Sequence, residues 1–297
     1  MGVYISNDQL QVEIANPGEV YQGTRFDWTG FITQVKWKDH HGKVHTFCVP
    51  ESLIDGEGTG GIGLCNEFGI ADPIGYDEAL PGDQFPKLGV GRLTRLDEAD
   101  YNFFRNYPVE LFDMGTSIEN NVVYSKVQAH PCNGYAAELS KVIKLVDNTL
   151  SIEYKLSNTG IKPIHTEEYV HNFLRIDEHP VGPAYQLTLP IQIETKDMEQ
   201  GYSPSILRVE GKQVSWNTTP SQAFYARIED VEQPDGATWE LVHRPSGIGV
   251  REWSDFKVKT IALWGLQHVV SPEVFIQVAV QPGETQCWTR KYEFFSQ

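Results

Sequence analysis

The chain has 297 residues with 40 acidic and 24 basic side chains, which gives a net charge of -16 with histidine neutral. This charge repels nucleic-acid phosphates and anionic membrane surfaces, so we expect neither as a partner. With 40% hydrophobic residues, the chain is long enough to bury the core of one large β domain or two ordinary ones.

The N-terminal segment 1–9 has no basic region followed by an apolar run, and nowhere do about 18 apolar residues stand in succession. We therefore expect a soluble, cytoplasmic protein. The four cysteines are widely spread, which indicates reduced thiols rather than a disulfide framework or a zinc site: Cys48, Cys65, Cys132 and Cys287. Three nearby histidines lack a supporting Asp or Cys pattern, so we expect no metal there: His40, His41 and His45.

Short segments with a two-residue apolar period follow one another along the chain: Gln9–Ile14, Phe31–Trp37, Val122–Ala129, Ala137–Val146, Leu150–Leu156, Tyr185–Thr195, Ala223–Ile228, Thr238–His243, Lys257–Leu266 and Val274–Val280. Turn-forming residues such as Gly, Pro, Asn and Asp separate them. No ten-residue stretch has a convincing helical period. The pattern predicts an all-β, largely antiparallel protein of packed sheets with little helix. No hydrophilic linker interrupts it, so we expect one domain over residues 1–297.

The region Glu51–Leu93 differs from the rest, because it is rich in Gly, Pro and Asp and poor in strand signal. Long irregular segments of compact domains often carry function. Its run Gly56–Gly63 lacks the GK[ST] ending of a phosphate-binding loop, and a flexible loop is the better interpretation.

The segment Thr166–Asp177 reads as one long strand that gathers ionisable side chains on one face. Apolar residues alternate with them and predict a core-facing side. A histidine, an aromatic platform and carboxylates on a rigid strand suit a small-molecule site. The alternative is an ordinary, partly buried histidine. The residues that share the first face are Glu167, Tyr169, His171, Phe173, Arg175 and Asp177.

Several short motifs occur in a fixed order from Tyr21 to Glu284: Tyr21-Gln-Gly-Thr-Arg-Phe-Asp-Trp-Thr-Gly-Phe-Ile, Asn66-Glu-Phe-Gly, Gly75-Tyr-Asp-Glu, Phe85-Pro-Lys-Leu-Gly-Val-Gly, Tyr169-Val-His-Asn-Phe, Leu263-Trp-Gly, Ser271-Pro-Glu and Pro282-Gly-Glu. The ordered set resembles the galactose mutarotase-like, or aldose 1-epimerase-like, superfamily, and within it a poorly characterised bacterial branch. The resemblance implies a β-supersandwich with a carbohydrate cleft on its concave sheet. It also implies that a strand histidine is the catalytic acid, and His171 matches that position.

Anomer interconversion of a neutral sugar or glycoside needs a proton delivered to the ring oxygen and another removed from the C1 hydroxyl, from groups that we expect on opposite sides of the sugar. It needs neither metal nor nucleotide, and we expect no cofactor. Well-known mutarotases take the base from a late strand, but the corresponding segment Ile261–His268 has no carboxylate. Glu67, in the irregular segment, is our first candidate for the base, before Glu273 and His268.

We also expect a set of substrate-binding residues, with a solvated surface role as the open alternative for Arg25 and Lys87: Arg25, Asn66, Lys87, Tyr169, Trp264 and His268. Two other functions stay open. One is a carbohydrate-binding protein that catalyses nothing, because this fold does not fix function. The other is a phosphosugar epimerase, which would gather several cations from a set of four: Arg25, Lys87, Arg92 and Arg95.

Overall fold

A computed structural model describes residues 2–194, 199–201, 204–229, 231 and 238–297 of the chain. Within these residues, strands dominate, and the helical element is the 3-10 turn η2 (Pro204–Ile206). Every pair of neighbouring strands described is antiparallel. The expectation of an all-β, antiparallel architecture with little helix is confirmed.

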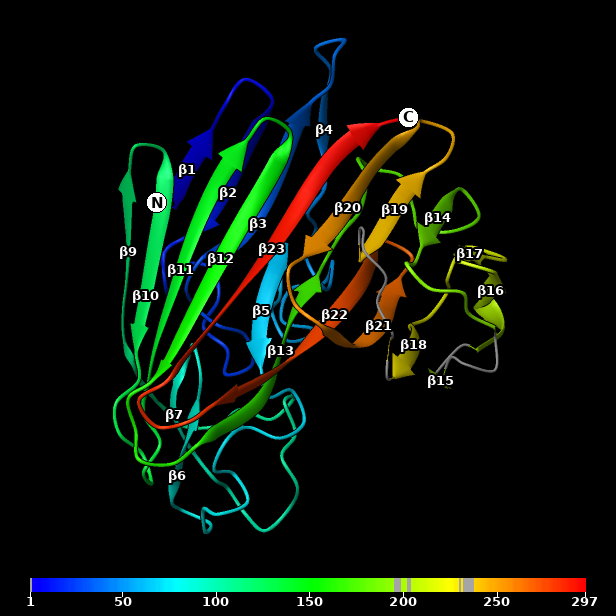
Figure 1. The fold of residues 1–297 in the computed structure, drawn as a ribbon. Coiled ribbons are helices and arrows are strands. Elements are labelled where there is room, and N and C mark those ends of the chain that lie inside the picture. The colour runs from blue at the N-terminus through cyan, green and yellow to red at the C-terminus, as the bar shows by residue number, and fades with distance from the viewer. Residues whose placement is uncertain (1, 195–198, 202–203, 230, 232–237) are drawn as a thin grey trace.

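One sheet contains ten of the described strands, and the strand with His171, β13 (Ile164–Asn172), lies near its middle (Figure 1). In spatial order its strands are β1 (Val3–Ser6), β2 (Leu10–Ala15), β3 (Phe31–Lys38), β5 (Leu64–Phe68), β13 (Ile164–Asn172), β22 (Val269–Val280), β21 (Val258–Leu266), β18 (Phe224–Glu229) and β15 (Glu199–Gly201), with β4 (Val44–Thr46) beside β3.

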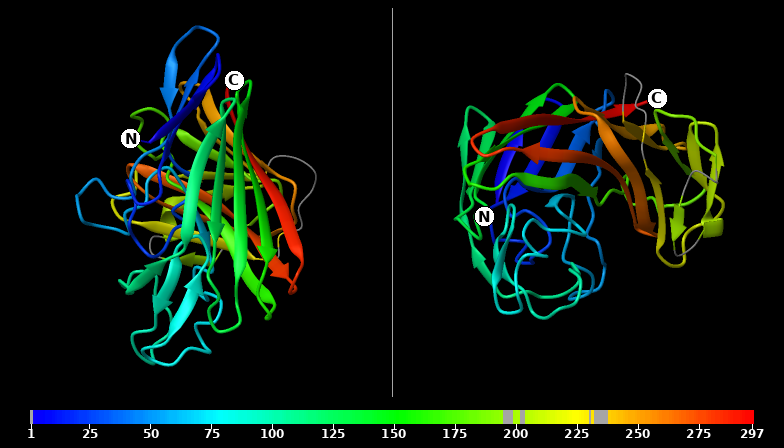
Figure 2. Two further views of the ribbon diagram at one scale, coloured as in Figure 1. Left: turned by 90° about the vertical axis from the view of Figure 1, so that its left-hand side faces the viewer. Right: turned by 60° about the horizontal axis from the view of Figure 1, so that its bottom comes forward.

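A second sheet, also of ten described strands, covers one face of the first, and a small three-stranded sheet lies at one end (Figures 1 and 2). The second sheet runs in the order β16 (Leu207–Glu210), β17 (Gln213–Trp216), β14 (Tyr185–Thr188), β19 (Trp239–His243), β20 (Ile248–Ser254), β23 (Thr285–Ser296), β12 (Thr149–Asn158), β11 (Ala137–Val146), β10 (Val122–Gln128) and β9 (Asp113–Glu119). The small sheet is β6 (Gln84–Lys87), β7 (Gly91–Thr94) and β8 (Val109–Leu111).

The main core lies between the two large sheets, where the inward-facing apolar side chains of both form one cluster. A buried ionic triad lies in this core. Arg290 on β23 contacts Glu168 on β13 at 2.8 Å and Glu252 on β20 at 2.6 Å, and the side chains of all three are fully buried. Each carboxylate therefore depends on the same guanidinium for its counter-charge.

Removing Arg290 should be strongly destabilising. Arg290→Ala leaves Glu168 and Glu252 buried without a cation, which typically costs about 3–5 kcal/mol of unfolding free energy. Arg208→Ala is the matched control, because Arg208 and its partner Glu210 are exposed, and we expect about 0–1 kcal/mol there. Urea denaturation measures both. Similar losses in the two variants would contradict the assigned role of Arg290.

The strand predicted over Thr166–Asp177 is too long, because β13 ends at Asn172. Beyond it the chain turns toward the segment 46–49, and Asp177 takes a φ of 51°. There the Asp177 carboxylate accepts from the Thr46 backbone N–H at 3.0 Å and contacts His45 Nδ1 at 2.9 Å. Beyond Asn172, these bonds and the isolated bridges of Leu174 to Cys48 and Val270 take the place of regular strand pairing.

Two further predictions need correction. The segment Glu51–Leu93 is not irregular throughout, because it contains β5, β6 and the start of β7; β5 is buried along its whole length and has no polar alternation to reveal it. The strand predicted over Tyr185–Thr195 ends at Thr188, and Thr195 lies outside the described residues. No helix of the described residues is long and apolar enough to cross a membrane.

The four cysteines are free thiols, of which only Cys287 is exposed. Burial raises the pKa of the Cys48 thiol to about 12 and that of Cys65 well above its ordinary value, and the thiolate is the reactive form. We expect a thiol reagent to label one cysteine rapidly in the native protein and four after denaturation without reductant. Fewer than four would indicate a disulfide.

Candidate functional site

The outer face of β13, turned away from the second sheet, brings ionisable side chains from three neighbouring strands together. Tyr169 stands opposite Glu67 on β5, and its hydroxyl donates to the Glu67 carboxylate at 2.6 Å. The Tyr169 ring stacks on Phe275 of β22 at 4.5 Å. The alternation predicted for this strand is thus confirmed over Glu167 to His171, and it places the polar groups on a rigid surface.

His171 and Glu273 meet on this face. His171 Nε2 lies 3.3 Å from Glu273 Oε1, and the two side chains are only 6% and 5% exposed. The Ser271 hydroxyl donates to the same Oε1 at 2.9 Å and accepts from the Asn172 backbone N–H at 2.8 Å. The Ser271 side chain on β22 therefore bonds to the backbone of β13 next to this pair. The following residue, Pro272, has no backbone N–H to donate to β13.

Aromatic rings surround His171. Its imidazole stacks on Phe173 with ring centres 4.0 Å apart, and Trp264 meets it edge-on at 5.1 Å. Phe26 lies at 6.1 Å. The second ring nitrogen, Nδ1, is buried and has no hydrogen-bond partner among the described residues.

The apolar surroundings shift both members of the pair toward their uncharged forms. Burial raises the pKa of Glu273 to about 8, against the smaller lowering effects of the Ser271 hydrogen bond and of Arg25. Burial, with a smaller contribution from Arg25, holds the pKa of His171 well below its ordinary range. At neutral pH the carboxyl is then largely protonated and the imidazole is neutral.

Glu67 has the opposite environment, although it is also fully buried. Its Oε2 accepts from Arg25 Nε at 2.9 Å and from Tyr169, and its Oε1 faces Lys87 Nζ at 3.1 Å. Burial alone would raise the pKa of Glu67, but the charges of Arg25 and Lys87 outweigh it and lower that pKa. Glu67 is therefore a carboxylate whose charge is shared among three donors.

Two loop residues cover Arg25. The ring of Phe103 lies 4.1 Å from the guanidinium carbon, and Thr59 Oγ1 lies 3.4 Å from Nη1. Arg25 Nη2 donates to Tyr169 at 2.9 Å. Because the loops and sheet enclose these groups, Arg25 is 5% exposed and Lys87 is 1% exposed.

Comparisons with known proteins identify the fold. No family model and no curated protein matches the sequence, but solved structures do. A GalM/aldose epimerase homologue from C. elegans has a TM-score of 0.64 and 12% identity, over 100% of this chain and 99% of that chain. A galactose mutarotase-like protein from Lactobacillus casei has a TM-score of 0.61 and 14% identity, over 99% and 100%. Another, from Clostridium acetobutylicum, has 0.61 and 12%, over 99% and 95%. The chain has the galactose mutarotase-like fold.

On this galactose mutarotase-like fold, most of the residues predicted for the site lie together. His171, Glu273 and Trp264 form one group, and Arg25, Glu67, Lys87 and Tyr169 form the adjoining one. Glu67 does not lie in an irregular segment, as its sequence context predicted, but on the buried strand β5. Glu273 lies inside β22 rather than at its start.

Asn66 is placed on the other face of the galactose mutarotase-like sheet. It neighbours Glu67 in β5 and therefore points the opposite way, where its Nδ2 donates to Glu168 and, at 3.2 Å, to the Tyr169 carbonyl. His268 lies in the turn between β21 and β22, and its Nε2 contacts the carbonyl oxygens of Pro50 and Glu51 at 3.2 and 3.1 Å. The side chains of Asn66 and His268 thus bond to other parts of the protein, and the structure does not bring either into the group around His171.

The sequence did not single out Ser271 or Phe275 as site residues. Ser271 belongs to the Ser-Pro-Glu motif. It stands two residues before Glu273, and residues two apart in a strand share a face, so the sequence could have placed it beside Glu273. Phe173 was on the predicted face, but its stacking on His171 depends on where β13 ends. No group of three or more metal-binding side chains is positioned to hold a metal ion in the described part of the chain.

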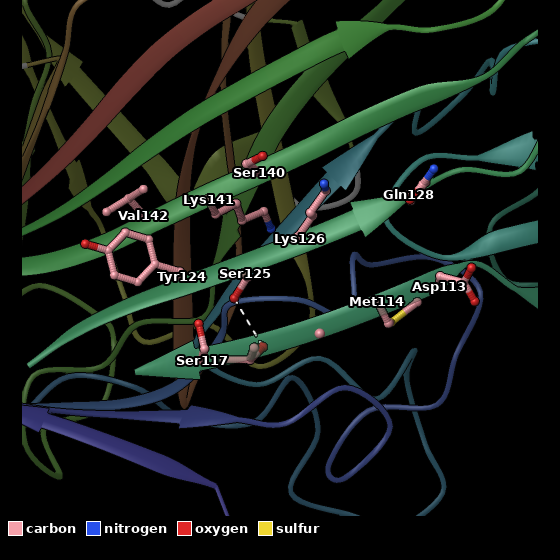
Figure 3. Close-up of a pocket in the computed structure, with 12 residues that line it drawn as sticks. Asp113, Met114, Ser117, Tyr124, Ser125, Lys126, Gln128, Ser140, Lys141 and Val142 are labelled. Atoms are coloured by element: carbon pink, nitrogen blue, oxygen red, sulfur yellow. Dashed lines mark hydrogen bonds between the residues drawn. The ribbon is translucent and has the colours of Figure 1, made fainter. Parts of the chain in front are cut away.

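A separate hollow of about 660 Å³ lies over β9, β10 and β11 (Figure 3). Tyr124, Lys126 and Ser140 are among its lining residues, and Gly115 leaves room on the central part of β9. None of the predicted site residues lines it. The hollow is thus distinct from the group around His171.

The pH dependence of stability should reveal the titration of Glu273. Because its pKa is about 8 when folded and about 4.3 when unfolded, its contribution is fully present below pH ~4.3 and is lost as the pH rises toward 8. Each pKa unit is worth about 1.4 kcal/mol, so the unfolding free energy of the wild type relative to Glu273→Gln should fall by several kcal/mol over this range. Urea denaturation at a series of pH values measures it. A constant difference would contradict the shifted titration.

Proposed function

We propose that the protein is an aldose 1-epimerase-like isomerase that interconverts the anomers of a neutral sugar. The observation that carries the proposal is the contact between His171 Nε2 and Glu273 Oε1 at 3.3 Å, beside the rings of Phe173 and Trp264 on the outer face of the sheet. One group of the pair supplies a proton and the other takes one, which is the requirement of ring opening.

The side-by-side placement of the pair suits this chemistry. The ring oxygen and the C1 hydroxyl oxygen are both bonded to C1, so one donor and one acceptor that lie next to each other serve both atoms from the same side. This differs from the expectation of groups on opposite sides of the sugar. Trp264, beside His171, is half-buried and offers an aromatic surface for the apolar face of a pyranose.

Glu273 is a better partner for His171 than Glu67 is. Glu67 holds Arg25, Lys87 and Tyr169, and taking a proton would weaken all three bonds. We assign it the task of fixing Arg25, which we propose to contact a sugar hydroxyl, and the fully buried Tyr169 beside it. Lys87 is part of the same support.

A neutral substrate fits the cations better than a phosphosugar does. Of the four cationic side chains that could gather, Arg25 and Lys87 share the charge of Glu67. Arg92 pairs with Glu110, and Arg95 binds the carbonyls of Tyr76, Ala79 and Asp97.

The remaining expectations accompany this proposal. A small carbohydrate is the partner, the protein acts in the cytoplasm without a cofactor, and residues 1–297 form one domain. The continuous apolar cluster that includes residues from Ile5 to Phe294 supports the last of these.

Exchange between sugar anomers, followed by NMR across a panel of aldoses, tests the function. His171→Asn and Glu273→Gln should each reduce the exchange rate by ~10²-fold or more, since an acid or base group typically contributes ~10²–10⁴-fold. His165→Asn is the matched control, because His165 lies on the same strand but is exposed, and its rate should equal that of the wild type.

Folding of each variant is checked by circular dichroism. Full activity in a folded His171→Asn variant would show that the histidine is structural. A wild type that binds a sugar by calorimetry, yet exchanges no anomer faster than buffer over the whole panel, would overturn the enzyme and support the alternative of a carbohydrate-binding protein.

A further inference from the structure

The outer face of the sheet carries two buried glutamates with contrasting partners. Glu67 faces two cations and a phenol, with Arg25 at 2.9 Å and Lys87 at 3.1 Å. Glu273 faces a hydroxyl and an imidazole, with Ser271 at 2.9 Å and His171 at 3.3 Å. Where two carboxyls in one site have such different surroundings, the difference assigns one as the ionised group and the other as the acid.

No arginine or lysine of the described residues forms an ion pair with Glu273; the ionisable side chain that contacts it is His171. Arg25 and Arg227 act on it only through weaker long-range attraction, and Glu67 opposes them. His171 in turn is enclosed by Phe173, Trp264 and Phe26. A carboxylate and an imidazolium would be poorly solvated among these rings, whereas a neutral acid beside a neutral imidazole loses little solvation free energy on burial.

We propose that Glu273 is a neutral carboxylic acid at rest and is the proton donor of the reaction, with His171 as the acceptor. This reverses the roles that the resemblance to mutarotases implies for the histidine. The catalytic part of the inference rests on the proposed function, whereas the protonation state of Glu273 does not.

The proton transfers balance. Glu273 gives its proton to the ring oxygen as the bond between that oxygen and C1 breaks. The C1 hydroxyl gives its proton to the unprotonated ring nitrogen of the neutral His171 as the C1 carbonyl forms. The pair is then a carboxylate beside an imidazolium. When the ring closes on the other face of the carbonyl, the C5 hydroxyl returns a proton to Glu273 and His171 returns one to the C1 oxygen.

Ser271 is a positioning residue in this arrangement. Its hydroxyl takes a hydrogen bond from the Asn172 backbone N–H and gives its own hydrogen to Oε1 of Glu273. This orients the carboxyl toward His171. Because the bond goes to an oxygen that becomes charged, it also favours the carboxylate and keeps the acid from being held too firmly in its protonated form.

Carbon-13 NMR of the full chain with carboxyl-labelled glutamate tests the protonation state directly. Loss of one resonance in Glu273→Gln assigns Glu273, and loss of another in Glu67→Gln assigns its matched control. We expect the Glu273 resonance to titrate with a midpoint of about 8, and that of Glu67 below the ordinary value of about 4.3. A Glu273 midpoint at or below the ordinary value would overturn the inference, whatever the activity.

The variant Ser271→Ala adds a second test. With the fold verified by circular dichroism, the Glu273 midpoint should move to higher pH, because a donor to the charged form is lost. An unchanged midpoint would overturn the role of Ser271. In the wild type, anomer exchange should fall as the pH rises through the Glu273 midpoint; a rise there would make Glu273 the base. A wild type without exchange overturns the proposed function and the donor role, but leaves the NMR test of protonation intact.

Discussion

The arrangement of the site depends on the buried guanidinium of Arg290, which joins β13 to the second sheet through Glu168 and also holds Glu252. Glu168 lies between Glu167 and Tyr169 in the strand, so this ion pair fixes which residues of β13 face inward. A shift of one residue would exchange the two faces. It would place Tyr169 and His171 in the apolar core between the sheets and turn Val170 to the outer face. The charge between the sheets thus determines which groups reach the opposite surface.

Electrostatic contrast then differentiates groups that the strands place close together. Glu67 and Glu273 are both fully enclosed, yet one is neutralised by Arg25 and Lys87 while the other contacts a neutral ring and a hydroxyl. Burial desolvates both carboxyl groups, so the neighbouring side chains decide whether the pKa of each glutamate is raised or lowered. The chain's net charge of -16 has little bearing on this site, because its local charges are paired over distances of about 3 Å, well inside the Debye length of about 10 Å.

The two-residue period predicted the fold class and the face shared by Tyr169 and His171, because alternation is a local property of the backbone. The same rule failed for β5, whose five residues are all buried, so that neither its strand nor the side of Asn66 was recognised. The proximity of Glu273 to His171 depends on the pairing of β13 with β22, which are about a hundred residues apart in the chain. The strand pattern and the resemblance to a family both pointed to His171, whereas Glu273 was only the second candidate for the base, after Glu67.

The seam between β13 and β22 has a consequence for how such a site changes during evolution. Regular register between the two strands is described up to Glu168 and Ile276, and backbone pairing returns at Leu174 and Val270. Between these points side chains make the described bonds: Ser271 accepts from the Asn172 N–H, and Asn172 Nδ2 donates to the Pro272 carbonyl at 2.6 Å. Hydrogen bonds between backbones do not depend on which side chains the strands carry, whereas hydrogen bonds made by side chains are lost or changed by a single substitution. The strands can therefore acquire a new spacing or polarity beside His171 while the core between the sheets remains unaltered.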